Sequence, residues 1–203
     1  MKTTKIFANV TNSMGELDVL LPLFSKLNAI GQYNFVVHLT SREFISKFDE
    51  SDFYKYCVKE LNINLIKFDL LPIRKQKKNI FDKFLNRFLY SINLIRMTRY
   101  YCGVDIFIHD YTSHRLILSP IYLIAKLSAS KIYAIPHGLG VQIDTAIIDK
   151  ADIIGNVTML IFDQETKDFH QKFGYKNMIN IGYVKLYKAV SYTHLTLPTS
   201  DLV

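Results

Sequence analysis

One histidine in the sequence follows a strand-like segment at a position where parallel sheets usually place chemistry. Residues 131–135 (KIYAI) predict a strand, and the turn after it reads PHGLG. Its proline directs the chain out of the sheet, and its two glycines allow a ligand to approach the backbone closely. Histidine is the side chain best suited to proton transfer near neutral pH. We therefore expect His137 to be catalytic and Gly138 and Gly140 to bind substrate, with a purely structural turn as the alternative.

A second group of polar residues follows the predicted strand at residues 104–109. The sequence HDYTSH places His109, Asp110 and His114 in one short loop. A carboxylate beside an imidazole can orient it for acid–base work, so we expect Asp110 to be catalytic and the two histidines to bind substrate. The alternative is that Asp110 or Thr112 caps the helix that follows and that His109 is a satisfied, half-buried residue.

The turn after the first predicted strand, at residues 5–11, is the third candidate. It reads NSMGE, so that Gly15 and Glu16 stand at the start of the next predicted helix. A glycine lets the backbone approach a ligand, and free N–H groups at a helix start attract anions. We expect both residues to bind substrate, and a plain tight turn is the alternative. The turn lacks the GxGxxG pattern of a dinucleotide site.

Short β-branched segments alternate with longer amphipathic segments, which is typical of βα units around a parallel sheet. The sequence therefore predicts an α/β fold, a Rossmann-like parallel sheet with helices on both faces. In such sheets ligands bind beyond the carboxyl ends of the strands, where all three candidate turns would lie. Strands are expected at residues 5–11, 34–39, 64–68, 104–109, 131–135, 158–162 and 178–181, and helices at residues 16–30, 41–48, 52–61, 72–101, 113–127 and 164–173.

The composition is that of an ordinary globular domain with a basic surface. The 203 residues are 49% hydrophobic and 21% charged, and the formal net charge is +7. Two cysteines without a CxxC pair, and histidines that are not clustered, predict neither a disulfide framework nor a metal site, and we expect no cofactor. The N-terminus lacks a signal-peptide pattern, and no segment approaches the roughly 20 apolar residues of a membrane span. We expect a cytoplasmic protein.

Much of the positive charge lies in residues 73–101, whose apolar residues recur at the 3.6-residue period of a helix. A basic helix with aromatic residues on its apolar side can lie in a membrane interface, so we expect it to face the inner surface of the membrane. The alternative is that the aromatic stripe packs on the sheet and the charges form a solvated face. No nucleic-acid motif accompanies the charge, and we expect no nucleic-acid partner. The basic residues assigned to the membrane are Lys75, Lys77, Lys78, Lys83 and Arg87, around a face of Phe81, Phe84, Leu85 and Phe88.

Three of these features together resemble the N-terminal domain of GT-B-type enzymes. They are a strand ending in His137-Gly138, a hydrophobic strand closing in Asp110, and a first loop with Gly15-Glu16. Over roughly residues 4–187 the sequence is most similar to enzymes of surface-polysaccharide and teichoic-acid biosynthesis. These include CDP-glycerol glycerophosphotransferases, whose corresponding turn also carries His-Gly, and non-hydrolysing UDP-N-acetylglucosamine 2-epimerases.

The resemblance implies that residues 1–187 form the acceptor-side domain of a transferase, the N-terminal half of a GT-B architecture. His137 would be a catalytic base or transition-state partner, and Gly138 would shape the site. The implied partners are a nucleotide-activated sugar or glycerol donor and a glycan or lipid-linked acceptor. GT-B enzymes hold the donor mainly in a C-terminal domain, which would be missing here, so that the fragment alone would be inactive. The alternatives are a 2-epimerase-like enzyme and a non-catalytic Rossmann-like binding module.

The last residues of the chain, 190–203 (VSYTHLTLPTSDLV), show neither the period of a strand nor that of a helix. The run VSYTHLTLPT resembles a translated sequencing adapter. We expect residues 190–203 to be a non-native tail that takes no part in the fold, with a natural polar tail as the alternative.

Overall fold

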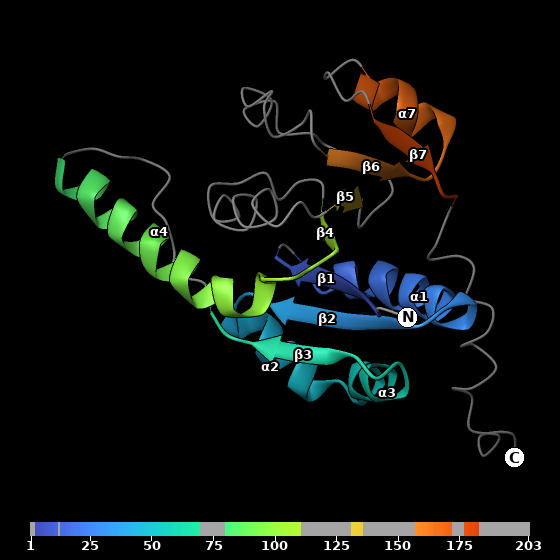
Figure 1. The fold of residues 1–203 in the computed structure, drawn as a ribbon, viewed down its shortest axis with the longest axis horizontal. Helices are drawn as coiled ribbons and strands as arrows, with labels where there is room; N and C mark the ends of the chain where they lie inside the picture. Colours follow the sequence, from blue (N-terminus) through green and yellow to red (C-terminus); the bar gives the residue numbers. More distant parts are fainter. Residues whose placement is uncertain are drawn as a thin grey trace, which may run out of the picture.

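The computed structural model describes residues 3–11, 13–69, 80–110, 131–135, 157–171 and 177–182. Within these residues the chain forms one sheet of seven strands flanked by helices (Figure 1). The strands are β1 (Thr4–Val10), β2 (Tyr33–Leu39), β3 (Asn64–Lys67), β4 (Ile106–Asp110), β5 (Lys131–Ile135), β6 (Val157–Ile161) and β7 (Met178–Asn180). The helices are α1 (Gly15–Ile30), α2 (Arg42–Glu50), α3 (Asp52–Glu60), α4 (Ile80–Tyr101) and α7 (Gln164–Gln171).

The strands lie in the order β3-β2-β1-β4-β5-β6-β7, and every pair of neighbours is parallel. From β1 the chain adds β2 and β3 on one side of the sheet, and it then returns to place β4 to β7 on the other side of β1. The direction in which strands are added therefore reverses between β1 and β4. In open α/β sheets this reversal is the topological switch point, beside which ligands bind. The seven predicted strands are confirmed, whereas the predicted helix at residues 113–127 lies outside the described residues.

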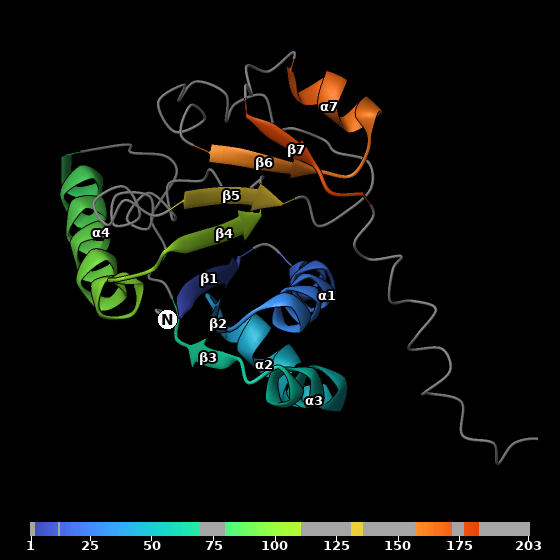
Figure 2. The same cartoon turned by 45° about the vertical axis from the view of Figure 1, so that its right-hand side comes forward.

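Helices cover both faces of the sheet, as the sequence predicted (Figure 2). Side chains alternate along a strand, so Ile6 and Phe7 of β1 point to opposite faces. The face of Ile6 packs against α1, α2 and α3, with Phe24 of α1 among the buried residues. The face of Phe7 packs against α4 through Met97 and Tyr101. The two cores therefore hold the sheet between helices.

Two short polar side chains fix the end of β2 and the start of α2. Ser41 caps α2, because its hydroxyl oxygen accepts a hydrogen bond from the backbone N–H of Phe44 at 3.3 Å. The hydroxyl of Thr40 donates to the backbone oxygen of Val10 at 2.8 Å. Ser41 thus fixes the start of α2, and Thr40 joins the carboxyl ends of β1 and β2.

Candidate functional site

The candidate residues after β1 and at the end of β4 lie at the same edge of the sheet. These strands are neighbours, with Ala8 of β1 beside Ile108 of β4. The turn that carries Gly15 and Glu16 therefore lies next to the end of β4 at Asp110. Two of the three predicted groups thus flank the topological switch point, where ligands bind in this class of sheet.

The third group, the turn with His137, begins at this same edge. Asp110 pairs with Ile135, the last residue of β5, so the chain leaves β5 beside the end of β4. His137 itself lies outside the described residues, and its catalytic role stays a prediction. The same holds for the substrate-binding roles of His114, Gly138 and Gly140.

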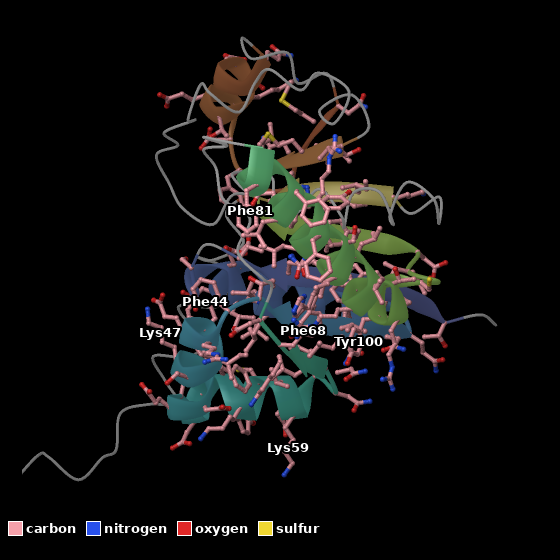
Figure 3. The ribbon with its side chains drawn as sticks, turned by 90° about the vertical axis from the view of Figure 1, so that its left-hand side faces the viewer. Phe44, Lys47, Lys59, Phe68, Phe81 and Tyr100 are labelled. Carbon is pink, nitrogen blue, oxygen red and sulfur yellow. The ribbon has the colours of Figure 1, made fainter. Side chains whose placement is uncertain are left out.

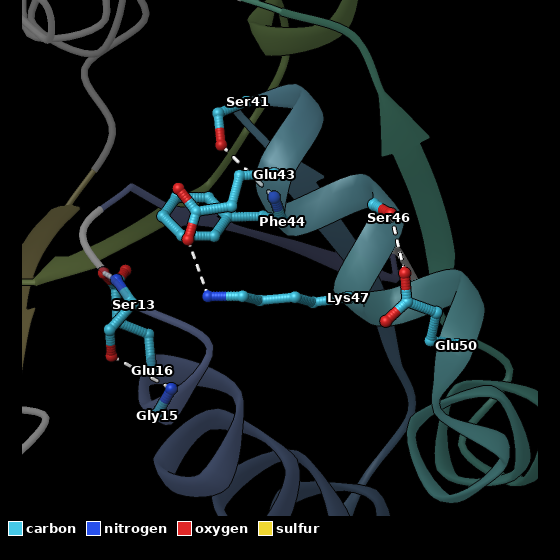
Figure 4. Close-up of polar contacts among 9 residues, drawn as sticks. All are labelled: Ser13, Gly15, Glu16, Ser41, Glu43, Phe44, Ser46, Lys47 and Glu50. Carbon is cyan, nitrogen blue, oxygen red and sulfur yellow. Dashed lines mark hydrogen bonds and ion pairs between the residues drawn. The ribbon is translucent and has the colours of Figure 1, made fainter.

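Glu16 holds the turn between β1 and α1 together. Its side chain is 3% exposed, and its carboxylate accepts hydrogen bonds from the backbone N–H of Thr11, at 3.1 and 3.3 Å, and of Ser13, at 3.0 Å. The backbone N–H of Gly15 donates to the Ser13 hydroxyl at 3.0 Å (Figure 4). The negative charge of Glu16 thus lies at the start of α1, where the helix dipole stabilises an anion. The bonds of this carboxylate thus run to the turn before α1, while the first N–H groups of the helix donate to oxygens of Ser13 and Met14.

The start of α2 lies one strand further along the edge, and a side chain of the protein accepts a hydrogen bond from one of its backbone N–H groups. Ser41 caps the helix, and Glu43 in its first turn forms an ion pair with Lys47 at 2.6 Å (Figure 4). Both partners of this ion pair are more than half exposed, so it contributes little stability. Of the described helices at this edge, α1 thus has its first N–H groups bonded to Ser13 and Met14, and α2 is capped by Ser41.

A row of buried polar side chains crosses the middle of the sheet on the face covered by α4. Asn9 of β1 pairs with His38 of β2, and the register of β1 with β4 brings His109 to the corresponding position on the other side. All three are at most 1% exposed. The Nδ1 atom of His38 lies 2.9 Å from the hydroxyl of Tyr101, and its Nε2 atom lies 3.0 Å from the backbone oxygen of Phe68.

The proton positions in this row follow from the pKa of His38. Burial lowers that pKa from 6.5 to about 4, so the imidazole is neutral near pH 7. A carbonyl oxygen only accepts hydrogen bonds, so Nε2 carries the proton and donates to Phe68. Nδ1 then accepts from the hydroxyl of Tyr101, which stays protonated because burial raises the pKa of this phenol well above its usual value.

The remaining contact of the Tyr101 hydroxyl fixes the orientation of Asn9. The hydroxyl has a single proton, which goes to His38, so Asn9 has to present an N–H to the tyrosine oxygen. With its oxygen toward the hydroxyl, the amide leaves Nδ2 without a hydrogen-bond partner in the described part of the chain. Turning the amide by about 180° supplies the required N–H. Hydrogen bonds then tie β1, α4 and β2 together beneath the switch point.

His109 lies deep beside this row. Its ring stacks on Phe107 with the ring centroids 5.6 Å apart, and its exposed fraction is 1%. The ring therefore belongs to the core on the α4 side of the sheet. The substrate-binding role of His109 stays a prediction, and it requires a ligand that reaches below the carboxyl edge.

The basic residues assigned to a membrane lie on or before α4. Arg87 is exposed on this helix, Lys83 lies in its first turns, and Lys75, Lys77 and Lys78 fall outside the described residues. None of the described helices has the length and apolar character needed to cross a bilayer. In the same described ranges, no three His, Cys, Asp or Glu side chains gather in a group that could hold a metal ion.

The sequence predictions missed the contacts of Asn9, His38 and Tyr101. A signal for the first two was present, because each is a polar residue between apolar neighbours, next to the last position of its strand. Parallel strands that carry a polar residue at the same distance from their ends bring these residues side by side. Tyr101 gave no such signal, since its partner is fixed only by the packing of α4.

No family model matches the sequence, and no curated protein is significantly similar to it. Solved structures do match the fold. The crystal structure of LpCGTa in complex with UDP matches with a TM-score of 0.57 and 16% identity, over 98% of this chain and 58% of that chain. MurG from Acinetobacter baumannii matches with a TM-score of 0.49 and 12% identity, over 89% of this chain and 45% of its own.

The chain thus spans 58% of the length of the LpCGTa chain. At this level of identity the likeness concerns the fold alone. The strand order, the parallel pairing and the helices on both faces agree with it. The predicted fold class is confirmed: the chain is an α/β, Rossmann-like sheet of the kind found in the N-terminal half of a GT-B architecture.

Proposed function

We propose that this chain is the acceptor-side domain of a GT-B-type transferase, which passes a sugar or a glycerol phosphate from a nucleotide-activated donor to an acceptor hydroxyl. We place the reaction in cell-surface glycan synthesis, on a glycan or lipid-linked acceptor at the inner face of the membrane. The observation that carries the proposal is the GT-B-like sheet, in which the strand ends that lead into the three candidate turns lie side by side at the switch point.

Transfer to a hydroxyl needs a group that takes its proton, and His137 is our candidate. Its turn starts at Ile135, which lies beside Asp110 in the sheet. As the acceptor oxygen forms its bond to the donor, His137 would take the hydroxyl proton, and the nucleotide would leave with the electron pair of the broken bond. Asp110 would orient the imidazole of His137, as carboxylates do for catalytic histidines.

The helix starts at the carboxyl edge support an acceptor-side role. A nucleotide diphosphate is commonly held by free N–H groups at a helix start. At α1 the first backbone N–H groups donate to oxygens of Ser13 and Met14, and at α2 the hydroxyl of Ser41 accepts one. We therefore propose that a second domain binds the donor phosphates. The match to LpCGTa, over 58% of its length, is consistent with a partner domain of this kind.

The proposal is tested by following nucleotide release from the protein joined to its second domain. UDP-sugars and CDP-glycerol are offered with and without an acceptor glycan, since LpCGTa was solved with UDP. We expect release that depends on the acceptor, of UDP where a sugar is transferred and of CMP where glycerol phosphate is transferred from CDP-glycerol. The present chain alone should release neither nucleotide and should bind neither of them in a calorimetric titration.

Two results would contradict the proposal. If the joined protein converted the sugar of the donor to its epimer without any acceptor, its activity would be that of an epimerase. Binding of a phosphorylated partner, with no turnover of any donor by the joined protein, would make it a non-catalytic binding module.

A further inference from the structure

Helix α4 has apolar side chains on two opposite faces. Its inner face packs Met97 and Tyr101 against the sheet, where both are at most 2% exposed. Its outer face carries four large apolar side chains, which we call the outer stripe. They are Phe81, Phe84, Phe88 and Ile95, with exposed fractions of 70%, 69%, 55% and 73%.

The spacing of the outer stripe places its members along one side of the helix. Steps of three, four and seven residues return to the same side of an α-helix, and Met97 lies about half a turn away from this line. In Figure 3, Phe81 lies near the N-terminal end of α4, while Phe68 and Tyr100 lie near the end that packs on the sheet. The alternative that the aromatic stripe packs on the sheet therefore does not hold for Phe81, Phe84 and Phe88.

Basic side chains accompany the outer stripe. Between residues 74 and 99 the sequence has eight Lys or Arg and a single acid, Asp82. Arg87 is exposed on α4. Further along, the guanidinium group of Arg96 lies 4.8 Å from the ring centre of Phe68, and that of Arg99 lies 5.9 Å from that of Tyr100. Several large exposed apolar side chains along one face of a helix are typical of an interaction site, and here basic residues flank them.

We propose that the outer stripe docks in the interface of an anionic bilayer, with its apolar side chains at the acyl boundary and the neighbouring arginines on lipid phosphates. The other occupant to consider is a second copy of this chain. Two copies joined through the stripe would bring their exposed basic residues together, and like charges repel. Anionic headgroups complement the same charge, so the observations favour the bilayer.

The direction of α4 relates this surface to the candidate site. The N-terminal half of α4, which carries Phe81 and Phe84, extends past the arrowheads of β2 and β3 (Figure 1). Docking would thus bring the carboxyl edge of the sheet toward the bilayer. That position suits a lipid-linked acceptor. This link to an acceptor rests on the proposed function, but the docking of α4 on a bilayer does not.

Fluorescence tests the docking directly, because the chain contains no tryptophan. The Phe84→Trp variant places a single fluorophore on the outer stripe. The matched control is Phe53→Trp on α3, at a side chain that is 43% exposed. With vesicles of phosphatidylglycerol and phosphatidylcholine, we expect the emission of the Phe84→Trp variant to shift to shorter wavelength, and that of the control to stay unchanged.

Co-sedimentation with the same vesicles measures the affinity. Replacing both Phe84 and Phe88 with serine should reduce binding by about tenfold or more, because apolar surface no longer enters the bilayer. Salt at 1 M should release the wild-type chain, since it shortens the screening length to about 3 Å. The melting temperature of the serine variant reports whether it is folded, and the tryptophan variants decide the question if it is not.

Several results would overturn the docking proposal. One is an absence of any blue shift in the Phe84→Trp variant, and another is equal binding to anionic and purely neutral vesicles. A third is sedimentation of the wild-type chain as a dimer that the Phe84 and Phe88 serine variant abolishes, with no binding to vesicles. That last result would show that the outer stripe joins two copies. None of these measurements depends on transferase activity.

Discussion

Acidification should destabilise this protein through one buried histidine. The side chain of His38 is fully buried, and burial lowers its pKa from 6.5 to about 4. An unfolded chain regains the ordinary pKa, so between these two values it binds a proton that the folded protein does not. The unfolded state is then favoured as the pH falls from 6.5 toward 4, and the stabilising contribution is fully present only above pH 6.5.

The size of the effect follows from the difference between the two pKa values. A single group with these values destabilises the folded state by about 2 kcal/mol at pH 5 and about 3 kcal/mol at pH 4. Domains of this size are stable by only about 5–15 kcal/mol in total. Protonation of His38 alone would therefore remove a considerable part of the free energy of unfolding.

The assay compares urea unfolding of the wild-type chain and the His38→Gln variant across this pH range. Glutamine does not titrate, and its side-chain N–H can still donate to the backbone oxygen of Phe68. We expect the difference in free energy of unfolding to move by about 2 kcal/mol in favour of the variant between pH 7 and pH 5. Two curves that stay parallel would refute the reasoning, because His38 would then not be held neutral by burial.

Three other changes probe the fold and the site. Tyr101→Phe should lower the free energy of unfolding by about 1–3 kcal/mol in urea, since it takes away the hydrogen bonds to His38 and Asn9, and an unchanged midpoint would show that the hydroxyl contributes nothing. Glu16→Ala should cost about 1–3 kcal/mol by removing the acceptor for Thr11 and Ser13, whereas a loss of turnover at full stability would indicate a substrate contact. Deleting residues 190–203 should leave the melting temperature unchanged, and a drop of several degrees would show that the tail packs on the domain.

The sheet could be predicted from the sequence because its signals are local. Apolar segments such as residues 5–11 and 34–39, separated by amphipathic ones, indicate parallel strands with crossover helices, and the structure has them. The placing of Glu16 and Asp110 at one edge followed from the same rule about strand ends. What Glu16 does there could not be predicted, since its bonds to Thr11 and Ser13 depend on the backbone path of the turn.

The packing of α4 could not be predicted from the sequence pattern alone. The period that Phe81, Phe84 and Phe88 follow is real, yet it marks the exposed side of the helix. The packed side carries Asn86 and Asn93 as well as apolar residues, and no periodicity rule assigns buried asparagines to a core. Which face of the helix meets the sheet is decided by tertiary packing, in particular by the fit of Tyr101 against Phe7.

Turnover of the protein joined to its second domain, measured after His137→Ala, tests the proposed chemistry most directly. His137 follows Ile135, which ends β5 beside Asp110, so its loss should remove the proton acceptor and leave the sheet intact. We expect turnover to fall by roughly 10²–10⁴-fold, the usual contribution of a positioned proton-transfer group, with an unchanged melting temperature. The His38→Gln variant is the control, because its effect should be on stability and not on rate. Near-normal turnover in the His137→Ala enzyme would contradict the catalytic role and leave the turn as a structural one.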